Sequence, residues 1–145
     1  MRYIAIAISL IFLVTGLIRA GVSVIVISEL TGWWQLGGEA AVAVAETKQF
    51  IADASTNLVG FTPLTYFVFL LLMGVVVSIG AIGQLWRKTW GLYLIGLYVC
   101  CHAFLFVNFM TVNPKVGLVA LALLLALFLA WAKRSDEVKP QGIPA

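Results

Sequence analysis

The polar residues with the most chemical potential lie together in one apolar stretch, residues 90–110. They are Tyr98, Cys100, Cys101, His102 and Asn108, and His102 is the only histidine of the chain. Inside a hydrocarbon layer an imidazole can bind a cofactor, relay a proton or form a structural hydrogen bond. Because a low dielectric favours the neutral imidazole, we expect a histidine that is hydrogen-bonded to Tyr98 or to a neighbouring helix. The ligand and relay roles stay as the alternative.

The rest of the polar inventory predicts no catalytic residue, no cofactor and no metal site. A haem held by two histidines would need a second histidine, and ion pumping would want carboxylates inside the apolar runs, where none occurs. Cys100 and Cys101 are adjacent, so they point to different faces of a helix and cannot form an unstrained disulfide. We therefore interpret them as small apolar residues and do not expect an enzyme.

Arg19 is the one charged residue within the first apolar run, residues 3–27. At a rise of 1.5 Å per residue its backbone lies roughly 24 Å from Tyr3, hence about 6 Å short of the far boundary of a layer about 30 Å thick. A long arginine can extend its head group over that distance. We expect an interfacial arginine, and the alternative is a buried arginine that binds a ligand or a partner's carboxylate.

Four apolar runs must position these residues, at 3–27, 61–85, 90–110 and 116–132. With 63% hydrophobic and 10% charged residues and a mean hydropathy of +1.09, the chain is typical of an integral membrane protein. The sequence predicts an all-α, four-transmembrane-helix bundle with up-down-up-down topology, in which Asn113 and Pro114 begin the last helix. Residues 1–132 form the single transmembrane domain, and residues 133–145 form a cytoplasmic tail.

The distribution of charge predicts the orientation. Six cations would share one side of a four-span protein, and two would lie on the other: Arg2, Arg87, Lys88, Lys133, Arg134 and Lys139 against Lys48 and Lys115. By the positive-inside rule both termini are cytoplasmic, and all tryptophans then fall near a membrane boundary. Residues 91–133 resemble small bacterial inner-membrane proteins, which implies that membrane as the location. The cations are too scattered for a nucleic-acid partner.

The connection at residues 31–60 is the only long one, and its middle predicts an amphipathic helix in the first extracytoplasmic loop. Glu39, Glu46 and Asp53 recur every seven residues, and apolar residues gather on another face. The adjacent pair Trp33 and Trp34 predicts a docking surface for a membrane partner, and a lid over the helix ends is the alternative.

Small residues form stripes on two of the predicted spans. They are Ala5, Ser9, Gly16, Ala20 and Ser23 in the first and Gly74, Ser78, Gly80 and Gly83 in the second. Such stripes allow helices to approach closely. We expect the stripes to meet within the chain, with contact to another subunit as the alternative.

These features predict a noncatalytic accessory or assembly subunit of a larger membrane complex. Its partners would be the lipid bilayer and other membrane subunits or further copies of the chain. The alternative is an oligomeric small-solute transporter or channel. The candidate contacts to a partner or solute are Arg19, Trp33, Trp34, Tyr98, His102 and Asn108. If these polar groups converge on a cavity, the transporter hypothesis is favoured.

Overall fold

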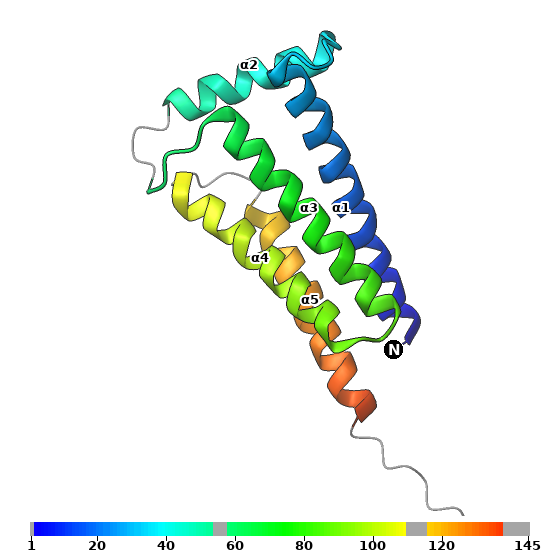
Figure 1. The fold of residues 1–145 in the computed structure, drawn as a ribbon. Helices are drawn as coiled ribbons and strands as arrows, with labels where there is room; N and C mark the ends of the chain where they lie inside the picture. The colour runs from blue at the N-terminus through cyan, green and yellow to red at the C-terminus, as the bar shows by residue number, and fades with distance from the viewer. Residues whose placement is uncertain (1, 54–57, 110–115, 138–145) are drawn as a thin grey trace, which may run out of the picture.

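The computed structural model describes residues 2–53, 58–109 and 116–137, which form five helices and, within these ranges, no strand (Figure 1). The helices are α1 (Arg2–Thr31), α2 (Gly38–Asp53), α3 (Pro63–Leu85), α4 (Thr89–Phe109) and α5 (Val116–Glu137). Helices α1, α3, α4 and α5 lie alongside one another and alternate in direction (Figure 1). Helix α2 lies across one end of this bundle, and the N-terminus and the α3–α4 connection lie at the other end (Figure 1).

Three of these helices are long and apolar enough to cross a membrane. They are Tyr3–Thr31 within α1, Pro63–Leu85 and Thr89–Phe109. Large apolar side chains are exposed on the outer faces of all three, as befits contact with lipid rather than water. The protein is therefore a helical membrane protein, and its second and third spans begin and end within two residues of the predicted bounds.

Helix α5 differs from the predicted fourth span in its extent. Its apolar part, Val119–Trp131, is shorter than the other three spans. The helix continues through Glu137, so residues 133–137, which were predicted to belong to the tail, are helical. The predicted turn at Asn113 and Pro114 and the tail residues 138–145 lie outside the described residues.

The stripes of small residues meet within the described chain: Gly74 and Ser78 of α3 lie against Gly16 and Ala20 of α1, whereas Gly80 and Gly83 face α4. A Cβ atom added to Gly16 would lie 2.8 Å from the backbone oxygen of Gly74, and one added to Gly74 would lie 2.8 Å from the backbone nitrogen of Ala20. Only glycine permits this backbone approach. The buried Ser78 hydroxyl at the same crossing donates to the Gly74 carbonyl over 2.8 Å, so this hydroxyl has a partner.

A second close crossing joins α3 to α4. A Cβ atom added to Gly91 would lie 2.6 Å from the backbone oxygen of Gly80. The connection between the two helices is tight, because Arg87 adopts a φ of 60° and the Lys88 amide donates to the Gly83 carbonyl over 2.8 Å. The two helices are therefore antiparallel neighbours, as the predicted up-down order of these two helices requires.

The direction of α2 is set by the end of α1. The Glu29 carboxylate accepts hydrogen bonds from the amides of Leu36, over 2.7 Å, and Gly37, over 3.2 Å. Gly32, Gly37 and Gly38 have φ values of 71°, 62° and 54°, a backbone conformation that favours glycine. These charge-assisted bonds and left-handed residues turn the chain from α1 into α2.

Helix α2 presents an apolar face to the bundle. Val44 is buried against Val26 of α1 and Phe67 of α3, and these three residues form a small apolar cluster. The acidic residues Glu39 and Asp53 are exposed. This packing holds α2 over the ends of α1 and α3 and closes one side of a cavity between the helices.

Candidate intramembrane binding pocket

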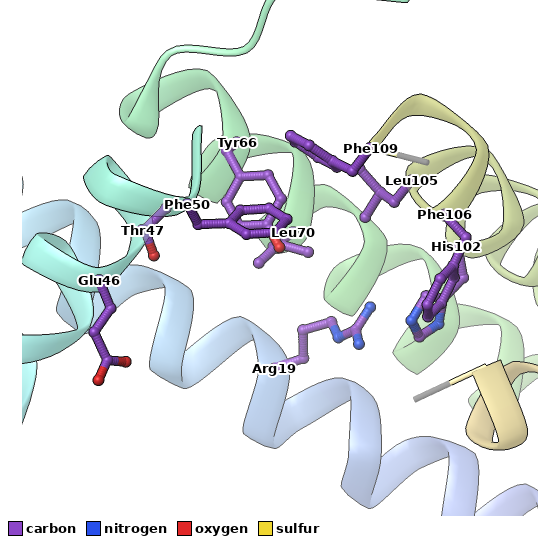
Figure 2. A pocket seen from close by; sticks show the side chains of 10 residues that line it. All are labelled: Arg19, Glu46, Thr47, Phe50, Tyr66, Leu70, His102, Leu105, Phe106 and Phe109. Carbon is purple, nitrogen blue, oxygen red and sulfur yellow. The ribbon is translucent and has the colours of Figure 1, made fainter. Parts of the chain in front are cut away.

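A pocket of about 460 Å³ lies beneath α2 and between α1, α3 and α4 (Figure 2). Every helix of the described chain except α5 contributes to its wall. Its lining residues are Arg19 from α1, Glu46, Thr47 and Phe50 from α2, Tyr66 and Leu70 from α3, and His102, Leu105, Phe106 and Phe109 from α4. Its volume is within the range of about 300–1,000 Å³ that small-molecule sites occupy.

The polar part of the pocket is formed by Arg19 and His102. Figure 2 shows the Arg19 guanidinium and the His102 imidazole pointing toward each other from opposite helices. Arg19 Nη1 and His102 Nδ1 are both buried, and neither has a hydrogen-bond partner in the described chain. Buried polar atoms are usually paired, so two unpaired atoms in one pocket mark it as a place where a polar ligand fits.

The structure adds detail to the two expectations for these residues. His102 is expected to form a hydrogen bond within the protein; its Nδ1 has no partner in the described chain, and its ring contacts Tyr98 and Phe106. Arg19 is expected to extend its head group to the interface, which stays a prediction; its Nη1 is buried, and the residue lines the pocket. The Arg19 side chain thus lies at a space that residues of α2, α3 and α4 line.

Helix α4 carries a row of rings spaced one turn apart, of which His102 and Phe106 line the pocket and Tyr98 adjoins His102. The ring centroids of Tyr98 and His102 are 5.6 Å apart, and those of His102 and Phe106 are 5.8 Å apart with nearly parallel rings. The Arg19 guanidinium carbon lies 5.5 Å from the centroid of the buried Tyr98 ring. The ring face of Tyr98 therefore supports the cation from the side away from α2, and the neighbouring ring stacking fixes the imidazole.

The apolar part of the pocket is a cluster of aromatic rings from three helices. The ring centroid of Phe109 lies 4.9 Å from that of Phe50 and 5.7 Å from that of Tyr66. Tyr66 lies in the first turn of α3. Thr62 caps the start of this helix, because the Thr62 hydroxyl accepts a hydrogen bond from the Thr65 amide over 3.2 Å. The pocket thus has a cationic end and an aromatic end.

Asn108 does not contact the pocket, although the sequence made it a candidate. Its side chain is fully buried, its Oδ1 accepts from the Val59 amide over 2.7 Å, and its Nδ2 donates to the Val59 carbonyl over 3.2 Å. This pair of bonds fastens the segment before α3 to α4. Asn108 is therefore a structural residue in this fold.

Trp33 and Trp34 lie apart from the pocket as well. They follow the last turn of α1, where their amides donate to the Ser28 carbonyl over 3.1 and 3.3 Å. Their side chains are 90% and 70% exposed. The structure thus brings Arg19, Tyr98 and His102 together and leaves the tryptophan pair on the outside.

Several residues of the pocket were not singled out from the sequence. The one-turn spacing of Tyr98, His102 and Phe106 on a helix could have found the α4 wall. Phe50, Tyr66 and the other contributions of α2 and α3 carry no such signal, because aromatic residues are common in apolar helices and only the tertiary contacts select these.

Metal chemistry has no support in the described residues, where no group of three histidine, cysteine, aspartate or glutamate side chains could hold an ion. Cys100 and Cys101 are free thiols. Comparisons of the chain with protein families, with curated proteins and with solved structures find no match. The pocket is therefore the feature on which a functional proposal must rest.

Proposed function

We propose that this protein binds a small solute in the pocket formed by Arg19 and His102 and handles it within the membrane as a transporter or carrier. The observation that carries the proposal is the pair of buried, unpartnered nitrogen atoms on different helices of one pocket. Each such atom costs about 1–3 kcal/mol when left unpaired. A ligand that pairs with both atoms recovers this free energy, and a charged residue at membrane depth is by default a functional candidate.

The proposal includes four membrane crossings, by α1, α3, α4 and α5, with α2 outside the cell and both termini in the cytoplasm of a bacterial cell. It is supported by the alternating helix directions (Figure 1). It is also supported by the cations Arg2, at the start of α1, and Arg87 and Lys88, in the α3–α4 connection, because both segments lie at the end opposite α2. Single cysteines at Gln49 and Lys139, in a chain without Cys100 and Cys101, should react with impermeant reagents from opposite sides. Reaction of both from the same side would contradict this topology.

Solute binding can be tested without knowing the solute in advance. The full chain is purified in mild detergent, its bound small molecules are extracted, and mass spectrometry compares the wild type with Arg19→Gln and His102→Leu. We expect a molecule that the wild type and the distant control Lys88→Gln retain and that both pocket variants lose. If all four proteins carry the same molecules in the same amounts, the pocket is not a solute site.

Transport is then tested with the molecule that the extraction identifies. The wild type, reconstituted alone into liposomes, should move it across the bilayer, and Arg19→Gln should not. A molecule that is retained but not moved would restrict the role to binding within the membrane.

A second candidate is the noncatalytic accessory or assembly subunit. It is favoured by the exposed Trp33 and Trp34 side chains, which lie on the turn that leads into α2, where a membrane partner could dock. Crosslinking in native membranes followed by mass spectrometry would identify the partner. The yield of the crosslinked complex should fall with Trp33→Ala or Trp34→Ala and stay unchanged with His102→Ala. Equal yields in all variants would contradict this role.

A further inference from the structure

The pocket under α2 has a charge that its ligand must balance. The Arg19 guanidinium carries a full positive charge, and its carbon lies 5.5 Å from the centroid of the Tyr98 ring. Among the lining residues the carboxylate is that of Glu46, an exposed residue at the α2 side of the pocket (Figure 2). This carboxylate does not pair with Arg19 Nη1, which has no hydrogen-bond partner in the described chain. An anion at the polar end would supply the missing countercharge.

The geometry of the polar end suits a carboxylate. The planar guanidinium presents its N–H groups as a fork that matches the two oxygens of a carboxylate. The His102 imidazole faces the same space, so one head group can contact both side chains (Figure 2). A neutral carbonyl group, such as that of a quinone, could accept the same hydrogen bonds but would leave the buried charge unbalanced.

The remainder of the pocket requires an apolar body of limited size. Apart from Glu46 and Thr47 at the α2 side, the wall beyond the polar end consists of apolar groups, chiefly the rings of Phe50, Tyr66 and Phe109 and the side chains of Leu70 and Leu105. At the roughly 30 Å³ that a water molecule occupies in the liquid, the pocket holds about 15 non-hydrogen atoms. This is the size of a medium-chain fatty acid or an aromatic acid, and it is too small for both chains of a phospholipid.

We infer that the ligand is a lipophilic monocarboxylate, whose carboxylate binds Arg19 and His102 and whose apolar body lies among the aromatic rings beneath α2. This inference rests on the proposed solute site and specifies its substrate class. It needs no cofactor and no covalent step.

The test uses tritiated dodecanoate and the full-length wild-type protein in lipid nanodiscs, with empty nanodiscs as the blank. Unlabelled dodecanoate should displace the probe from a saturable site, and dodecanol, which differs only in its head group, should be at least tenfold weaker because it lacks the charge-assisted bonds. Dodecyl phosphate and menadione complete the series. Because the series uses the wild type alone, it does not depend on the folding of any variant.

Variants add a second readout. Arg19→Gln should weaken dodecanoate binding at least tenfold, whereas Lys88→Gln, at the opposite end of the bundle, should leave it unchanged. Dodecanol or menadione competing as well as dodecanoate would overturn the carboxylate assignment and leave the solute site in place, and a clear preference for dodecyl phosphate would replace the carboxylate by a phosphate. Absence of saturable binding by the whole series, with a molecule still extracted from the wild type, would likewise refute the carboxylate but not the pocket.

Discussion

Replacing Gly74 by alanine should destabilise the bundle, whereas the same replacement at Gly21 should not. The Gly74 Cβ would lie 2.8 Å from the Ala20 nitrogen and 2.9 Å from the Gly16 oxygen, and these are backbone atoms that cannot turn aside. The helices would have to separate by several tenths of an ångström, and overpacking of this kind costs about 1–3 kcal/mol. At Gly21, which lies on α1 next to Ala20, nothing lies within 4 Å of the added Cβ atom.

The size of the difference follows from these two environments. Both alanines gain about 0.5–1 kcal/mol from the reduced freedom of the unfolded backbone, so this gain cancels and the two variants should differ by the overpacking cost, about 2 kcal/mol. For a chain of this length 1 kcal/mol shifts the unfolding temperature by about 2–4 °C, which makes the expected gap about 4–8 °C. Gly96→Ala, also in open space, provides the same control on α4.

The assay is thermal unfolding of the purified variants in one detergent, followed by tryptophan emission and by the loss of helical circular dichroism. Both signals are needed, because the tryptophans lie near the helix ends rather than at the crossing. If Gly74→Ala unfolds at or above the temperature of Gly21→Ala, α1 and α3 do not cross at these glycines, and the reasoning about close approach is wrong.

Three further predictions address the parts around the pocket. Asn108→Leu should lower the free energy of unfolding by about 1–3 kcal/mol and speed hydrogen exchange of the Val59 amide; unchanged exchange would exclude the proposed fastening. Glu29→Ala should raise hydrogen exchange across α2 without lowering the unfolding temperature of the bundle, and a global loss of stability would count against a local role. Arg19→Leu should insert normally and raise stability by about 1–3 kcal/mol in ligand-free protein, since it removes an unpaired buried group; a lower unfolding temperature would mean that Arg19 is a structural residue.

The helices were predictable because their signal is local. Long apolar runs determine where α3 and α4 lie, and the predicted bounds 61–85 and 90–110 agree closely with Pro63–Leu85 and Thr89–Phe109. The first helix is longer than its predicted span of 3–27, because α1 continues to Thr31 before Gly32 ends it. Helices commonly extend beyond the hydrocarbon layer, and an apolar run marks only the part within it.

The pocket was only half predictable, because it depends on which helix faces meet. Arg19 and His102 could be singled out as polar groups in apolar surroundings, but nothing in their spacing along the chain says that they face one another. Asn108 shows the same difficulty in reverse: its partner Val59 is distant in sequence, and a buried polar residue bonded to a distant backbone cannot be told from a ligand contact. Phe50 and Tyr66 could be assigned to the pocket only if the contacts of α2 and α3 were already known.

The crossing of α1 and α3 sets the depth at which the pocket lies. An added Gly74 Cβ would lie 2.8 Å from the Ala20 nitrogen, so Gly74 and Ala20 lie at the same level. From this level α1 rises about 16 Å to Thr31, and α3 rises about 16 Å to Pro63. The two helices therefore support α2 at equal heights. Deleting one turn between Arg19 and Thr31, about 5.4 Å, would shorten only one of these supports and tilt α2 toward the pocket without changing any residue that lines it. The capacity of the pocket is thus encoded in matched helix lengths as well as in the side chains of its wall.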